Sequence, residues 1–143
     1  MNFERRKNTS LNPSFLAGKQ NLFRMNIEVF RDYCLNKKGV EETFPFDEHT
    51  LVFKVMGKMF ALVALERQPS QANLKCDPER AIELREEYDT LITPGYHMSK
   101  VHWNTLYLDN LSSRLIIELI DHSYELVVSK LTRKLQEELN ALN

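Results

Sequence analysis

Residues 51–65 read LVFKVMGKMFALVAL, and this stretch decides the fold. Two runs rich in β-branched and aromatic residues flank Gly57-Lys58, and a Gly-X pair between such runs is typical of a two-residue β-hairpin turn. We therefore expect Gly57 to open a type II′ turn, which places Met56 opposite Met59. The hairpin predicts an antiparallel sheet around which the rest of the domain is built.

The expected register assigns each side chain of the hairpin to one of two faces, because side chains alternate along a strand. One face is wholly apolar and should form the core: it presents Leu51, Phe53, Val55, Phe60, Leu62 and Ala64. The other face presents Val52, Lys54, Met56, Met59, Ala61 and Val63. This second face is apolar but interrupted by a charge, so two interpretations stay open. Either residues 123–139 cover it, or it is an interaction face for a second copy or another protein. The candidate residues of that interaction face are Val52, Met56, Met59 and Val63.

Outward from the hairpin toward the N-terminus, apolar residues at helical spacing begin at Ile27 and continue to Cys34. Gly39 is the expected stop of this helix. The following segment 40–46 contains Pro45, which confines it to an edge strand or a loop because proline has no N–H to donate to a ladder.

Toward the C-terminus, residues 73–76 indicate a further short strand. Asp77-Pro78 is typical of a helix start, since Asp caps the first turn and Pro fits the first helical position. That helix should run to about Tyr88. Residues 93–95 (Thr-Pro-Gly) predict a turn, and residues 102–108 alternate as a strand.

A C-terminal helical pattern begins at Ser112 or Ser113 and continues to Leu139, with an expected break near residues 121–123. Hairpin-linked strands with flanking helices predict an α+β fold, in which an antiparallel sheet carries helices packed on one face. A chain of 143 residues suits one such domain, which we place at residues 25–143.

Charge is distributed unevenly along the chain. Residues 1–24 carry five basic residues and one acidic residue, a net charge of +4, whereas residues 25–143 hold 14 Lys and Arg against 19 Asp and Glu, a net charge of −5. We interpret residues 1–24 as a flexible basic extension, either a basic arm or an over-long gene start. The folded part is expected to be acidic.

The chain has only two cysteines, Cys34 and Cys76, and neither has the spacing of a zinc site or a disulfide framework. This usage is typical of a reducing cytoplasm. No apolar run approaches the roughly 20 residues needed to span a bilayer, so we expect a cytoplasmic protein without a membrane partner. We expect both cysteines to be small buried hydrophobic residues.

Six short motifs in order along the chain resemble the MmcQ/YjbR family. They are Phe44-Pro45-Phe46, Val52–Val55 with Gly57–Phe60, Leu74–Pro78, Pro94–Met98, Lys100–Asn104 and Ser123–Val127. The similarity extends from about Met25 to Leu131. It implies a CyaY-like (frataxin-like) α+β fold with a double-wing arrangement, and a role in DNA binding. It implies no enzymatic activity.

Nucleic-acid binding needs clustered cations, and aromatic side chains beside them suit exposed bases. The candidate residues are Lys54, Lys58, Lys75, Lys100, His102 and Trp103. They would serve if the sheet gathers them on one face, and the alternative is that the lysines are solvated and Trp103 lies in the core. The net charge of −5 weighs against DNA, because it repels a polyanion at a distance. A small anionic ligand held by Lys54, His102 and Trp103 is a further alternative.

We expect no enzyme, cofactor or metal. The four histidines lie outside any HExxH, GxSxG or P-loop pattern, which leaves no catalytic residue to name. A CyaY-like fold suggests iron by analogy alone. The first helix offers only Glu28 and Asp32 one turn apart, which is ordinary helix surface.

Overall fold

The predicted hairpin consists of strands β2 (Thr50–Val55) and β3 (Lys58–Ala64) in the computed structural model, which describes residues 25–96 and 98–143. These two strands lie inside a six-stranded antiparallel sheet of order β1-β2-β3-β4-β6-β5. The basic extension predicted for residues 1–24 lies outside the described residues.

The remaining strands are short. They are β1 (Val40–Thr43), β4 (Gln71–Lys75), β5 (Ile92–Pro94) and β6 (Trp103–Tyr107). β1 is the edge strand expected before Pro45. The prediction of a turn at residues 93–95 is wrong in part, because Ile92–Pro94 pairs with β6 as the other edge strand. Proline is tolerated there, since an edge strand has one side without a ladder.

In the described part of the chain four α-helices accompany the sheet: α2 (Ile27–Leu35), α3 (Pro78–Glu87), α4 (Ser113–Ser129) and α5 (Arg133–Ala141). The 3₁₀ turn η2 (Leu108–Asn110) leads from β6 toward α4. Each α-helix starts at a side-chain cap, and Asp77 accepts the backbone N–H of Arg80 as the sequence predicts. The helix break expected near residues 121–123 is wrong, because α4 continues through these residues. The helical region is interrupted at residues 130–132 instead, between α4 and α5.

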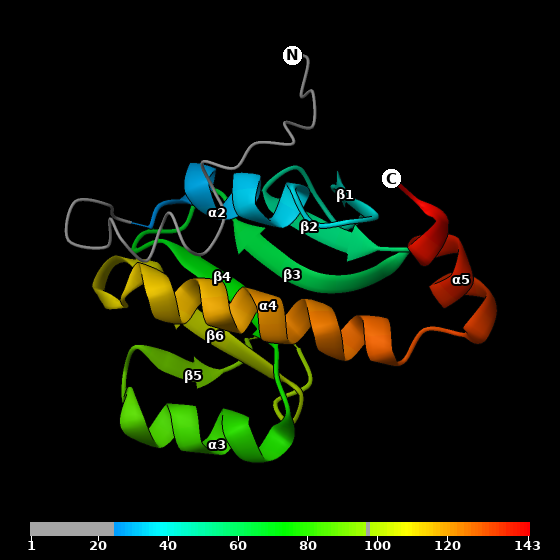
Figure 1. The fold of residues 1–143 in the computed structure, drawn as a ribbon. Helices are drawn as coiled ribbons and strands as arrows, with labels where there is room; N and C mark the ends of the chain where they lie inside the picture. Colours follow the sequence, from blue (N-terminus) through cyan, green and yellow to red (C-terminus); the bar gives the residue numbers. More distant parts are fainter. Residues whose placement is uncertain (1–24, 97) are drawn as a thin grey trace.

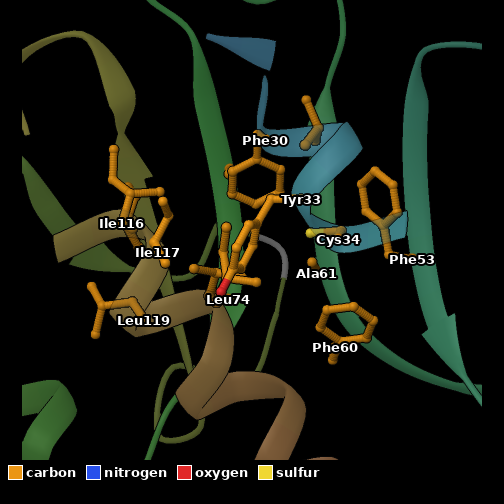
Figure 2. Close-up of a cluster of buried hydrophobic side chains, with 14 of the residues drawn as sticks. Phe30, Tyr33, Cys34, Phe53, Phe60, Ala61, Leu74, Ile116, Ile117 and Leu119 are labelled. Atoms are coloured by element: carbon orange, nitrogen blue, oxygen red, sulfur yellow. The ribbon is translucent and has the colours of Figure 1, made fainter. Parts of the chain in front are cut away.

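The helices pack on one face of the sheet, where α4 crosses the middle strands and α2 lies beside it (Figure 1). The main hydrophobic cluster fills this interface and includes side chains from all four helices, among them Phe30, Ala81, Ile116 and Leu139. Figure 2 shows Phe30, Phe53 and Phe60 within it, with Cys34 between the helix and the sheet. The predicted α+β class, with an antiparallel sheet and helices on one face, is confirmed.

The hairpin turn differs from the predicted one. Met56 and Gly57 both have positive φ, at 49° and 83°, so they form a type I′ turn, and Val55 lies opposite Lys58. Farther along, the pairing shifts by one residue, which leaves Phe60 as a bulge. The predicted type II′ turn and its register are therefore wrong.

The bulge is stabilised by a side chain from α4. The hydroxyl of Ser123 donates to the carbonyl oxygen of Phe60, and its Oγ accepts the backbone N–H of Lys75 at 3.0 Å. Ser123 is fully buried. Two backbone groups that the irregular ladder would leave unpaired thus find a partner, and this explains why polar residues at 121–123 do not end the helix.

No helix among the described residues is both long and apolar enough to cross a membrane.

Candidate binding face of the sheet

The side of the sheet turned away from the main cluster is the candidate site, and we call it the open face. Its middle row runs across all six strands through successive paired residues: Thr43, Val52, Leu62, Asn73, Thr105 and Thr93. Directly opposite residues of an antiparallel sheet point to the same side, so these six side chains share one face. The row carries no charge.

A second hydrophobic cluster lies on the open face. Val52, Leu62 and Trp103 are buried there, with Met59 and Met98 packed against them. In contrast to the main cluster, none of these five residues comes from a helix. The open face therefore has an apolar floor that is formed by the sheet and by the loop carrying Met98.

Two of the predicted lysines lie on the open face. Lys54 of β2 is opposite Met59, and Lys75 of β4 is opposite Trp103. Both lysines are partly exposed. Met59 and Trp103 belong to the same cluster. One lysine therefore lies beside Met59 and the other beside Trp103, each on a neighbouring strand.

The other predicted cations do not join them. Lys58 is opposite Val55, a residue of the main cluster, so its side chain starts on the helix-bearing side. His102 is exposed in the turn before β6, where its carbonyl oxygen accepts the N–H of Cys76. Lys100 is exposed in the same loop. The candidate set thus divides between the open face, the helix-bearing side and the loop before β6.

The predicted interaction face needs a similar correction. Val52 and Met59 lie on the open face, but Val63 is buried in the main cluster and Met56 packs against it. Leu62 and Ala64, predicted for the core, lie on the open face, and Ala61 lies in the main cluster. The bulge at Phe60 adds one residue to β3, and this exchanges the faces of residues 61–64, whereas Met59 and Phe60 keep their predicted sides. The expected cover from residues 123–139 lies on the helix-bearing side.

The loop after β5 folds back onto the open face. The N–H of Gly95 donates to the Trp103 carbonyl at 2.8 Å, and the N–H of Tyr96 donates to Thr105 Oγ1 at 3.2 Å. The Thr105 hydroxyl in turn donates to Asn73 Oδ1. A Cβ at Gly95 would lie 2.8 Å from the Cβ of Trp103, so glycine is what allows this close approach.

Arg85 of α3 holds the other end of this loop. Its Nε donates to Asn104 Oδ1 at 2.7 Å, and its guanidinium also donates to the carbonyl of Lys100. Asn104 Nδ2 completes the link by donating to the carbonyl of Ala81 on the same helix. The backbone that carries Lys100 and Trp103 is therefore fixed from the helix-bearing side.

Two residues of the open face were missed by the sequence reasoning. Tyr96 is 54% exposed, and the guanidinium carbon of Arg67 lies 5.2 Å from the centre of its ring. Tyr96 belongs to one of the family motifs, and this signal could have identified it. Arg67 had no local signal, because only the return of the loop after β5 brings Tyr96 next to it.

The acidic charge of the domain lies on the helices. Together α2, α3, α4 and α5 contain eleven Asp and Glu against six Lys and Arg, a net charge of −5. This equals the whole net charge of residues 25–143. Among the strand residues that the pairings assign to the open face, Lys54 and Lys75 are basic and Glu41 is acidic. The strands of the open face are thus less acidic than the helices.

The two cysteines are buried, as expected, and their thiols are protonated. Burial raises the pKa of the Cys76 thiol to about 11, and it raises the pKa of Cys34 well above its ordinary value. A thiol that stays protonated is a poor nucleophile. Within residues 25–96 and 98–143, no three His, Cys, Asp or Glu side chains lie close enough together to hold a metal ion.

A groove of about 240 Å³ lies between α4 and α5, on the helix-bearing side. Its lining includes Tyr124, Glu125 and Gln136. The carboxylate of Glu125 makes this groove unsuitable for an anionic ligand.

Comparison with known proteins gives a consistent result. A family model described as YjbR matches residues 35–126. The chain is 38% identical over 111 residues to the uncharacterised protein YbdF of Escherichia coli O157:H7, covering 77% of this chain and 90% of the relative. It is 36% identical over 109 residues to the uncharacterised protein YjbR of Escherichia coli K12, covering 75% and 91% of the two chains.

Two solved structures are similar in fold as well as sequence. Protein DR2400 of Deinococcus radiodurans, whose domain is described as DUF419, has a TM-score of 0.76 and 41% identity, covering 80% of this chain and 88% of its own. A protein from Pseudomonas syringae has a TM-score of 0.62 and 29% identity, covering 71% and 98%. The fold described above is therefore similar to that of these proteins over 80% and 71% of this chain.

Proposed function

This chain belongs to the YjbR family, and we propose that it is a non-catalytic DNA-binding module that contacts its ligand through the open face. The observation that carries this proposal is the separation of charge between the two sides of the molecule. A net charge of −5 spread evenly over the domain would repel DNA from every side. Because the net charge of the helices equals it, the strands of the open face present a polyanion with two lysines and one carboxylate.

The side chains of the open face suit the two parts of a nucleic acid. Lys54 and Lys75 can each donate to phosphate oxygens, which are the usual targets of protein hydrogen bonds to DNA. Beside Lys75 the middle row offers Asn73, whose side-chain amide can donate to a ligand while its Oδ1 accepts the Thr105 hydroxyl. The +4 charge of residues 1–24 adds long-range attraction.

A salt titration tests the proposal. Binding of a fluorescent oligonucleotide to the full chain is measured by anisotropy at several salt concentrations, starting below about 50 mM. We expect Lys54→Ala and Lys75→Ala each to weaken binding and to lower the slope of log K against log salt by about 0.7–0.9, since each variant loses a phosphate contact.

Lys58→Ala is the matched control, because it removes the same charge from the helix-bearing side of the same hairpin. We expect it to change the salt slope much less. A second control replaces Arg5, Arg6 and Lys7 with Gln in the full chain and separates the contribution of the basic extension. The proposal is lost when neither duplex nor single-stranded DNA binds at low salt, or when Lys58→Ala weakens binding as much as Lys75→Ala.

The second candidate function is binding of another protein or a second copy, and the apolar cluster on the open face favours it. Its centre is already buried, since Val52, Leu62 and Trp103 are 0%, 4% and 7% exposed. Only Met59 and Met98 are left partly exposed for a partner. Solution mass of the wild type and of Met59→Asp tests this candidate: a dimer that becomes a monomer in the variant supports it, and a monomer in both contradicts dimerisation there.

A further inference from the structure

We propose that Tyr96 and Arg67 form the base-stacking element of the open face, so that the ligand is a single-stranded rather than a duplex nucleic acid. This inference rests on the proposed function and adds the class of ligand to it. The structure offers one exposed aromatic ring in contact with a guanidinium on this face. That combination is the one by which proteins hold unpaired bases.

The obvious aromatic residue of the face cannot do this. Trp103 is 7% exposed and packs with Val52 and Leu62, so its ring surface is covered. Tyr96 is 54% exposed. The stacking role that the sequence assigns to Trp103 therefore passes to Tyr96, while Trp103 forms the floor beneath the ligand.

Tyr96 is fixed in place rather than carried on a loose loop. Its backbone N–H donates to Thr105 Oγ1, and the Thr105 hydroxyl donates to Asn73, so two strands of the sheet position it. The guanidinium of Arg67 lies 5.2 Å from the ring centre and comes from the connection between β3 and β4. A ring held in this way loses little conformational entropy when a base stacks on it.

The spacing between Lys75 and Thr105, the residue that positions Tyr96, suits one short segment of nucleic acid. Lys75 is opposite Trp103, and Thr105 lies two residues farther along β6, which is about 7 Å. A strand whose base stacks on Tyr96 can therefore place a neighbouring phosphate near Lys75. In a duplex the bases are already paired and stacked on each other, so a protruding tyrosine gains no stacking partner.

The test uses the full chain, a labelled oligothymidine and a labelled duplex of equal length, with affinities measured by anisotropy at low salt. We expect Tyr96→Ala to weaken oligothymidine binding by roughly 5- to 150-fold, the loss that corresponds to one stacked base. Tyr96→Phe keeps the ring and should retain wild-type affinity within about 2-fold. Binding of the duplex should be weaker in the wild type and little changed by either variant.

Arg67→Ala is a second variant that leaves the loop after β5 intact, and it should also weaken oligothymidine binding. Thermal unfolding confirms that each variant is folded. If Tyr96→Ala and Arg67→Ala both bind oligothymidine as the wild type does, while Lys54→Ala and Lys75→Ala bind it more weakly, the stacking inference is overturned and the proposed function stands. If no DNA binds to the wild type, the proposed function fails and the inference fails with it.

Discussion

Single polar side chains on the helix-bearing side determine how the sheet is built. Ser123 joins α4 to the bulge in β3 and to the backbone N–H of Lys75, the last residue of β4. His122, its neighbour, accepts the backbone N–H of Asp77 through Nε2 at 3.1 Å and so joins α4 to the start of α3. These two contacts place the strands that carry Phe60 and Lys75, and each leads to a prediction.

Ser123→Ala should destabilise the fold by about 1–3 kcal/mol, because it leaves the buried carbonyl of Phe60 and N–H of Lys75 without a partner. Chemical denaturation measures this change in the free energy of unfolding. Ser129→Ala is the control: it lies on the same helix, is exposed, and should change stability by less than about 0.5 kcal/mol. Equal effects of the two substitutions would contradict the role given to Ser123.

His122 should make stability depend on pH. Burial, and then the charge of Arg80, lower its pKa, while Asp77, Glu125 and Glu118 act in the opposite direction. The unfolded chain, with an imidazole pKa of about 6.5, binds the proton first as pH falls. The stabilising contribution is therefore fully present above about pH 6.5 and is lost as pH falls through the lower pKa of the folded state.

The substitution His122→Gln tests this, since a glutamine can accept the same N–H but does not titrate. We expect the fall in Tm between about pH 7 and pH 5 to be smaller in this variant than in the wild type. If Tm falls equally in the variant and the wild type, groups other than His122 cause the acid sensitivity.

At the scale of elements, the turn between β2 and β3 decides which residues of the two strands lie opposite each other. The type I′ turn at Met56 and Gly57 needs positive φ at both positions, and Gly39 has positive φ as well, at 75°. Their surroundings differ. A Cβ at Gly57 meets nothing within 4 Å, whereas a Cβ at Gly39 would lie 2.5 Å from Leu139 Cδ1 of α5.

Gly57→Ala should therefore cost roughly 1–2 kcal/mol, the conformational penalty of an L-residue in this region. Gly39→Ala should cost more, because the new methyl group also overlaps Leu139. Combining Gly39→Ala with Leu139→Ala should partly relieve this overlap. The double variant should therefore lose less free energy of unfolding than the sum of the losses in the Gly39→Ala and Leu139→Ala single variants. If the losses in free energy of unfolding are strictly additive in denaturation experiments, the packing of Leu139 of α5 against Gly39 is contradicted.

The elements themselves could be predicted well from sequence, and their faces only in part. The hairpin, the capped helix after Asp77 and the edge strand before Pro45 all follow from local chemistry, and each is confirmed. The faces of residues 61–64 depend on the bulge in β3. The bulge is satisfied by Ser123, which lies far along the chain, so no local pattern reports it.

At the scale of the molecule, the charge separation between helices and open face is the basis for binding. The sequence shows a net charge of −5 for residues 25–143, and only the fold shows that the helices carry it. The residues of the candidate site, too, are brought together only by the fold. Lys75 and Trp103 are brought together by the pairing of β4 with β6, across 27 intervening residues that include α3 and β5.

Glu41 is the carboxylate that this charge separation leaves on the open face, opposite Lys54. Glu41→Gln should strengthen binding of an oligonucleotide several-fold at low salt, because it removes repulsion of the phosphates, and the gain should shrink as salt screens the charge. Glu138→Gln, an exposed position on α5, changes the net charge equally and should have a smaller effect. Equal gains would indicate that net charge alone controls binding.

The measurement that tests the central claim most directly is a titration of the isotope-labelled full chain with single-stranded DNA at low salt, followed by amide chemical shifts. The account predicts shifts that concentrate on the open face and its loop, at Lys54, Asn73, Lys75, Tyr96 and Thr105, with α5 unaffected. Shifts confined to the helices, or no shifts at all, would contradict it.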